Sequence, residues 1–171
     1  NPDTVSVTRG VVDGNLFLNL NPDATIGAHG IGVYHAANQY GRITNNVFHA
    51  VRKGVQLDNY FNAKPAGADA LIANNTIESA RAGVWYNLFY SGASAWEIRD
   101  NTVSSYAAAN RGIWLTSLQG TVTGNVHDNH VTGGAAGIAG WNITSTGTIT
   151  VDHNDVADAD YGVRLFSTDY Q

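Results

Sequence analysis

Short runs in which apolar and polar residues alternate recur along the whole chain. One six-residue phrase has an apolar residue, two mostly polar or small residues, Asn, a variable residue and a second apolar residue. It reads VDGNLF from Val12, ITNNVF from Ile43, IANNTI from Ile72, IRDNTV from Ile98, VHDNHV from Val126 and VDHNDV from Val151. Alternation with a period of two residues indicates β-strands, not helices.

The asparagines of this phrase recur at intervals of 25 to 31 residues, at Asn15, Asn46, Asn75, Asn101, Asn129 and Asn154. A second phrase follows each one, with Gly first and a β-branched residue second, and it starts at Gly32, Gly54, Gly83, Gly112, Gly137 and Gly162. A repeat of this length with three short strands has the size of one β-helix coil. We therefore predict an all-β, right-handed parallel β-helix of about six coils, with the asparagines stacked in an internal ladder.

These phrases resemble the parallel β-helix repeat shared by pectate lyases, polygalacturonases, alginate lyases and epimerases, phage tailspikes and NosD-like surface proteins. The resemblance covers Val12 to about Leu165. Families of this fold mostly handle acidic or neutral polysaccharides outside the cytoplasm. The resemblance therefore implies a secreted or cell-surface protein whose partner is a polysaccharide or a cell-surface glycan. Because one scaffold carries many activities, the activity has to be argued from side chains.

The catalytic phrases of the characterised enzymes are missing. Polygalacturonases carry paired aspartates and a Gly-His-Gly phrase, whereas this chain has Ala28-His29-Gly30. Neither Arg-x-Pro-x-x-Arg of pectate lyases nor Asp-Pro-His-Glu of mannuronan epimerases occurs. We therefore expect a module that binds carbohydrate or acts as a rigid adhesive or structural domain. The alternative hypothesis is a polysaccharide lyase, epimerase or hydrolase, or a fragment of one, that acts on an acidic glycan.

The variable residue of the glycine phrase is predicted to point outward, so that successive coils form a surface column. The column is Tyr34, Gln56, Trp85, Trp114, Ala139 and Arg164, with Trp141 just beyond Ala139. Aromatic rings suit the C–H faces of sugars, and Gln and Arg can hydrogen-bond hydroxyl or carboxylate groups. We predict that carbohydrate binds at Tyr34, Gln56, Trp85, Trp114, Trp141 and Arg164. Alternatively, these rings pack under loops or against another domain or protein.

A charged patch is predicted on the strand that precedes the asparagine ladder. One column is Thr44, Ala73, Arg99, His127 and Asp152, and the column beside it is Asn45, Asn74, Asp100, Asp128 and His153. A lyase or epimerase needs a base and a cation that neutralises a uronate carboxylate. The candidate catalytic residues are therefore Arg99, His127, Asp128, Asp152 and His153. The structural alternative is a solvated ladder of charge pairs, each worth well under about 1 kcal/mol.

The same histidines could instead hold a divalent cation together with Asp128, Asp152 and Asp155. Carboxylate oxygens suit Ca²⁺ and imidazole suits Zn²⁺, so this mixture of donors fits neither ion clearly. We expect no resident metal or cofactor, with Ca²⁺ as the alternative.

A third set of residues is basic and precedes the glycine phrases, at Arg52, Lys53, Arg81 and Arg111. These side chains could meet an anionic glycan, or they could keep a sheet edge soluble.

Composition narrows the location and the partners. The chain has 171 residues, no Cys and a net charge of −5. The acidic balance argues against binding to nucleic acid, and no apolar run is long enough for membrane insertion. We expect residues 1–171 to form one β-helix domain. Because Asn1 is not an initiator residue, we expect this domain to be a piece of a longer protein. Flanking domains or a homo-oligomer are expected to cover the ends of the solenoid.

Overall fold

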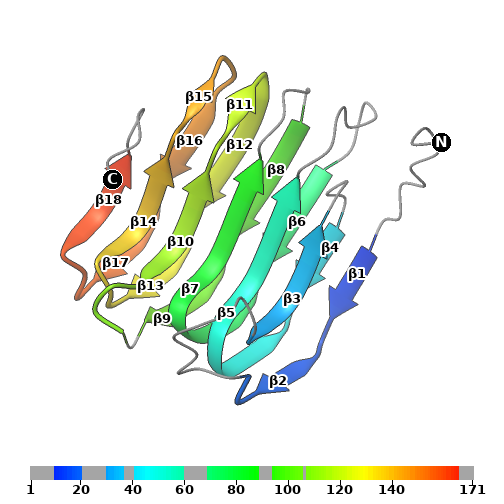
Figure 1. The fold of residues 1–171 in the computed structure, drawn as a ribbon, viewed down its shortest axis with the longest axis vertical. Coiled ribbons are helices and arrows are strands. Elements are labelled where there is room, and N and C mark those ends of the chain that lie inside the picture. Colours follow the sequence, from blue (N-terminus) through cyan, green and yellow to red (C-terminus); the bar gives the residue numbers. More distant parts are fainter. Residues whose placement is uncertain are drawn as a thin grey trace.

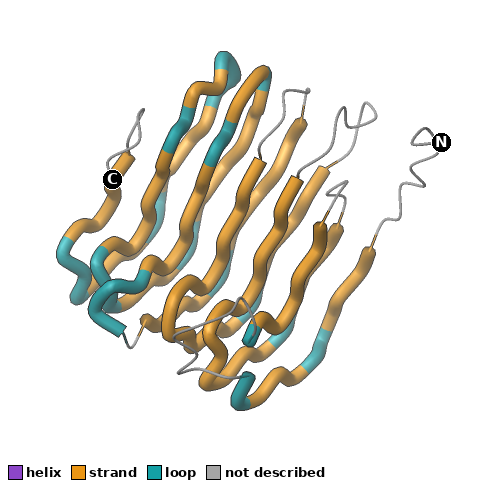
Figure 2. The backbone as a smooth tube through the Cα atoms, in the orientation of Figure 1, coloured by secondary structure: helices purple, strands orange, loops and turns teal. Residues whose placement is uncertain are grey.

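The computed structural model describes residues 10–20, 30–36, 41–59, 69–88, 94–105 and 107–165, and every regular element in these ranges is a β-strand. All described strand pairs are parallel. Strands occupy most of the described backbone, with short turns between them (Figure 2). The predicted all-β parallel solenoid is confirmed.

One side of the solenoid is a six-stranded sheet in which each strand precedes an asparagine of the ladder. In spatial order its strands are β1 (Gly10–Asp13), β4 (Gly41–Thr44), β6 (Asp69–Ala73), β8 (Ser94–Arg99), β12 (Val122–His127) and β16 (Ile149–Asp152). The strands follow chain order because each coil adds one strand beside the last.

A larger sheet contains the strands of the two remaining sides. These strands are β2 (Leu16–Leu18), β3 (Ile31–Ala36), β5 (Val47–Asn59), β7 (Thr76–Leu88), β9 (Thr102–Ser105), β10 (Arg111–Thr116), β13 (His130–Thr132), β14 (Ala136–Trp141), β17 (Asp155–Ala157) and β18 (Tyr161–Leu165). The long strands β5 and β7 belong to both sides: β5 pairs with β2 near its start and with β3 near its end. Two short strands, β11 (Gln119–Gly120) and β15 (Thr144–Ser145), pair separately.

The strands stack in six layers, and the inner four layers have a neighbour on both sides. In Figure 1 the chain runs down the far strands and up the near ones while it advances from β1 to β18, which is a right-handed path. This handedness agrees with the strong preference for right-handed connections between parallel strands.

The predicted asparagine ladder is present. Asn46, Asn75, Asn101 and Asn129 are 0–1% exposed, and each Oδ1 accepts the backbone N–H of the asparagine one layer earlier at 2.9–3.1 Å. The side-chain amide of Asn75 also donates to the carbonyls of Ile43 and Ala73. The ladder therefore satisfies backbone groups that the turn would otherwise leave buried and unpaired.

The residue before each ladder asparagine has a left-handed backbone conformation. Its φ lies between 49° and 67° at Gly14, Asn45, Asn74, Asp100, Asp128 and His153. Gly, Asn and Asp tolerate this region best, which explains why they dominate this position. The column of polar residues that precedes the ladder asparagines is therefore explained by the backbone conformation of the turn.

The interior is filled by apolar residues from successive layers, and the glycine phrase makes room for them. A Cβ on Gly54, Gly83, Gly112 or Gly137 would lie 2.2–2.6 Å from a β-branched side chain of the next layer. A Cβ on Gly124 would lie 1.9 Å from the ring of Trp96, which is 4% exposed. Glycine at these positions is therefore required by close approach.

Both ends of the stack leave apolar side chains exposed. Val11 and Leu16 in the first layer are 65% and 62% exposed, and Leu165 in the last layer is 54% exposed. Coverage of these ends by flanking domains or by further copies remains a prediction.

Candidate functional site

The outward side chains of β3, β5, β7, β10, β14 and β18 form a continuous surface, which we call the aromatic face. The strand register pairs Tyr34 with Gln56, Gln56 with Trp85, Trp85 with Trp114, Trp114 with Ala139 and Ala139 with Arg164, so the predicted column exists. Trp141 lies in the next outward column, opposite Thr116.

Exposure along this column is uneven. Tyr34 is 53% exposed, Trp85, Trp114 and Trp141 are half-buried, and Arg164 is exposed. Gln56 differs from the prediction because it is 7% exposed, with its amide within 2.6 Å of both Lys53 Nζ and Asp58 Oδ2. These contacts hold the Gln56 side chain, and its role in carbohydrate binding stays a prediction.

The basic residues before the glycine phrases also divide between interior and surface. Arg52 and Lys53 are 8% and 2% exposed, so they neither meet a glycan nor solubilise an edge. Burial, followed by the charges of Arg81 and Arg52, lowers the pKa of Lys53 to about 8. Arg81 is exposed and Arg111 is half-buried, so these two remain accessible.

Trp85 and Trp114 stack on one another and carry cations on their rings. The ring centroids are 4.4 Å apart at an interplanar angle of 17°. Lys53 Nζ lies 4.0 Å from the ring centroid of Trp85, and Arg111 Cζ lies 4.4 Å from that of Trp114. Trp85 Nε1 also donates to Thr116 Oγ1 at 2.8 Å. These contacts hold both indoles upright on the sheet.

A hollow of about 180 Å³ interrupts the aromatic face where Ala139 follows Trp114. Its lining includes the small residues Ala139 and Gly140 and the large residues Arg111, Trp114, Trp141 and Arg164. Among the described residues that line it, none is acidic. Burial, followed by the positive charges of Arg164 and Arg81, lowers the pKa of Arg111. The hollow is therefore lined by two tryptophans and two arginines.

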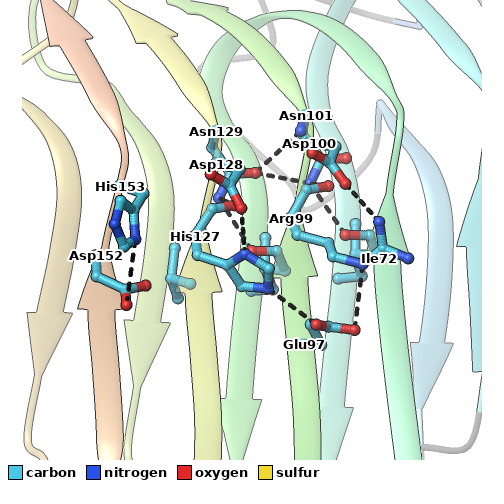
Figure 3. Close-up of polar contacts among 12 residues, drawn as sticks. Ile72, Glu97, Arg99, Asp100, Asn101, His127, Asp128, Asn129, Asp152 and His153 are labelled. Atoms are coloured by element: carbon cyan, nitrogen blue, oxygen red, sulfur yellow. Dashed lines mark hydrogen bonds and ion pairs between the residues drawn. The ribbon is translucent and has the colours of Figure 1, made fainter.

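On the opposite sheet the predicted charged patch also forms. The register pairs Arg99 with His127 and His127 with Asp152, and Asp128 and His153 follow at the turns, as Figure 3 shows. We call this group, together with Glu97 and Asp100, the charged corner. The structure thus brings together the five residues that the sequence selected.

Within the charged corner, His127 lies between two carboxylates. Its Nδ1 is 2.6 Å from Asp128 Oδ2, and its Nε2 is 2.9 Å from Glu97 Oε1 (Figure 3). The hydrogen bond to Asp128, opposed by burial and reinforced by Glu97, raises the pKa of His127. These contacts favour the imidazolium, which is a poor general base. The catalytic role of His127 remains a prediction.

The other charged side chains pair locally. Arg99 Nε lies 3.3 Å from Glu97 Oε2, and Arg99 also pairs with Asp100. His153 Nδ1 lies 3.4 Å from Asp152 Oδ2, and the His153 side chain is 77% exposed. Within the charged corner, positive and negative groups therefore pair locally, and its role as a catalytic site stays a prediction.

Two site residues were missed by the sequence analysis. Glu97 bridges Arg99 and His127, and its position two residues before Arg99 on the same strand is a signal that could have been read. Asp58 is fully buried and accepts from Gln56 and Asn87. Its spacing to Gln56 is likewise two residues, but nothing in the sequence indicates its burial.

The fold and the ladder define this chain as a parallel β-helix protein. The family model described as "Periplasmic copper-binding protein (NosD)" matches residues 20–171, and the chain belongs to this family. No curated protein and no solved structure matched the chain in the other comparisons. The family is described as periplasmic, which confirms the predicted location outside the cytoplasm. Within the described ranges no helix has the length and apolar character needed to cross a membrane.

The residues that the structure describes do not fit a copper centre. Thiolate and thioether ligands select Cu(I), yet the chain contains no Cys and no Met. Each histidine whose side chain is described pairs with a carboxylate: His49 with Glu78, His127 with Glu97 and Asp128, His130 with Asp155, and His153 with Asp152. Among described residues, no three His, Asp or Glu side chains form a group that could hold a metal, which includes the Ca²⁺ alternative. The side chains of His29 and His35 lie outside the described part.

Proposed function

We propose that this protein is an extracytoplasmic β-helix module that binds carbohydrate on its aromatic face. The observation that carries the proposal is the hollow at Ala139, where Trp114 and Trp141 border a floor of small residues. Indole faces stack on the C–H faces of sugar rings, and neighbouring guanidinium groups donate to hydroxyl or carboxylate oxygens.

The first sheet offers a weaker candidate surface. Its depression of about 540 Å³ is lined by Arg42, Glu97 and Asn125, among others. Of the described residues that line it, the aromatic one is Trp96, which is 4% exposed and packs against Tyr86. Without an accessible ring, this surface lacks the stacking platform that the aromatic face provides.

The scaffold suits a binding role because it is rigid. The aromatic face lies on strands whose inward neighbours, Val84 and Ile113, are fully buried. Rings held on such strands lose little conformational freedom when a ligand binds, which increases the affinity available from a small contact area.

The test is binding of the purified protein to an array of neutral and acidic oligosaccharides, followed by titration of any ligand with tryptophan fluorescence. We expect Trp114→Ala and Trp141→Ala each to weaken binding by roughly three- to tenfold, the value of one aromatic stacking contact. The control is Thr102→Ala, because Thr102 is exposed on β9, outside the aromatic face. Absence of binding to every glycan, or equal losses in all three variants, would contradict the proposal.

A further inference from the structure

The hollow at Ala139 is a gap of one layer in a stack of large side chains. The outward column runs Trp85, Trp114, Ala139 and Arg164 in successive layers. Trp85 and Trp114 fill adjacent layers with a ring spacing of 4.4 Å. Alanine in the next layer interrupts the stack, and Arg164 resumes it one layer later.

The dimensions of this gap fit a single ring. Parallel strands are about 4.8 Å apart, so Trp114 and Arg164, two layers apart, leave roughly 9 to 10 Å between their layers. Trp114 is stacked on Trp85, and the guanidinium of Arg111 lies over its ring. A sugar ring in the layer of Ala139 would therefore lie beside the Arg111 guanidinium and below that of Arg164. The volume of the hollow, about 180 Å³, is below the roughly 300 Å³ at which pockets begin to enclose drug-sized ligands. The gap therefore admits one monosaccharide unit of a chain.

The two arginines that line the gap favour an acidic monosaccharide over a neutral one. Arg111 Cζ lies 4.4 Å from the Trp114 ring centroid, and Arg164 Cζ lies 4.4 Å from that of Tyr161, so both guanidinium groups stand at the rim. The described lining residues include no carboxylate. The positive charge of Arg164 disfavours the charged form of Arg111, and a bound anion opposes this effect. The lowered pKa of Arg111, caused by burial and then by Arg164 and Arg81, is consistent with that situation.

We propose that the gap over Ala139 binds one hexuronate unit of an acidic glycan, with its ring between the stacked Arg111–Trp114 pair and Arg164 and its carboxylate held by Arg111 and Arg164. A carboxylate matches the planar donor fork of a guanidinium, which a neutral hydroxymethyl group does not. This inference rests on the proposed carbohydrate-binding function and adds the class of sugar and its position.

The experiment compares acidic and neutral ligands of the same shape. Trisaccharides of galacturonate, mannuronate and guluronate are titrated by calorimetry, together with the neutral trisaccharides obtained when their carboxylates are reduced. We expect at least one uronate trisaccharide to bind about tenfold or more tightly than its reduced counterpart, the effect of one charge-assisted hydrogen bond. Arg111→Gln and Arg164→Gln are expected to remove most of this difference.

The position is tested by filling the gap. Ala139→Leu places a larger side chain on the floor and is expected to abolish uronate binding, whereas Thr150→Leu is the matched control, because Thr150 is an exposed position of β16 on the other sheet. Circular dichroism and thermal melting establish that both variants fold. Ala139 is 4% exposed, so thermal melting is the check that the larger side chain is accommodated without loss of the fold.

The outcomes separate this inference from the proposed function. Neutral and acidic trisaccharides bound equally, or uronate binding unaffected by Ala139→Leu, would overturn the uronate site and leave carbohydrate binding intact. Binding of neutral array glycans without binding of any uronate would have the same meaning. Failure to bind any glycan would overturn both.

Discussion

Asn75 Oδ1 accepts both the backbone N–H and the side-chain amide of Asn46 at 3.0 Å, although the two residues are 29 positions apart in the chain. Asn75 in turn donates to the carbonyl of Ile43 at 2.9 Å and to that of its own-layer residue Ala73 at 3.0 Å. One side chain thus ties two layers together and satisfies buried groups in both.

Replacing Asn75 with Ala is therefore expected to destabilise the fold strongly. The change removes the acceptor of the buried Asn46 backbone N–H and the side-chain donor to the carbonyls of Ile43 and Ala73, and a buried polar group left unpaired costs about 1–3 kcal/mol. We expect the free energy of unfolding to fall by about 3 kcal/mol or more, measured by chemical denaturation. Asn15→Ala is the control, because Asn15 is exposed at the end of the ladder, and about 1 kcal/mol is expected. Similar losses in the two variants would contradict a buried ladder.

The stacking of the layers could be predicted because one residue type, Asn, recurs at the same position of every repeat. Six asparagines at a fixed place in each repeat set the register, and this register then placed Trp85 beside Trp114 and Arg99 beside His127. Side chains separated by one coil become neighbours in a solenoid, so the columns follow directly from the repeat.

Burial on the outer surface could not be predicted from the same pattern. Gln56 occupies the outward position of its phrase, yet it is 7% exposed and bonded to Lys53 and Asp58. Alternation with a period of two predicts on which face of a strand a side chain lies, but it does not predict which other side chains cover that face. The packing of Trp96 against Gly124 could not be predicted for a related reason: the large side chain and the glycine that makes room for it belong to different layers.

A second prediction concerns the glycine that opens each second phrase. A Cβ on Gly112 would lie 2.2 Å from Val131 Cγ1 and 2.7 Å from the carbonyl oxygen of Gly137, whereas one on Gly162 would have no neighbour within 4 Å. We expect Gly112→Ala to lower the free energy of unfolding by about 1–3 kcal/mol, the usual cost of overpacking, and Gly162→Ala to change it by less than about 0.5 kcal/mol.

The cause can be isolated by a double variant. Val131→Ala in the Gly112→Ala background removes the side-chain clash and leaves the contact with the carbonyl oxygen. The two changes are therefore expected to couple favourably in a double-mutant cycle followed by thermal denaturation. Strict additivity would show that Val131 is not what requires glycine at position 112.

A third prediction concerns the dependence of stability on pH. The pKa of His127 is raised above its ordinary value of 6.5, first by the hydrogen bond to Asp128. The stabilising contribution of the imidazolium is therefore fully present below the unfolded-state pKa and is lost as the pH rises through the folded-state pKa. The stability advantage of the native protein over His127→Gln should thus be larger at acidic pH than at alkaline pH, as measured by urea denaturation.

Proton NMR gives an independent readout of the same effect. The His127 ring signal is expected to titrate above the value of an unperturbed imidazole. Asp128→Asn should lower this pKa because it removes the largest cause of the shift. If the ring titrates at or below 6.5, the bridging geometry of the charged corner is wrong.

The fourth prediction concerns copper, which the family description names. Cu(II) bound by a protein normally has two or more imidazole or thiolate ligands from one site, and here no Cys or Met is present and His127 is shared between Glu97 and Asp128. After equilibration with Cu(II) and extensive dialysis, we expect well below one copper ion per chain by atomic absorption. We also expect an unchanged Tm, because a ligand that does not bind the native state cannot stabilise it. Stoichiometric copper that survives dialysis, together with a raised Tm, would instead assign a metal site to this chain.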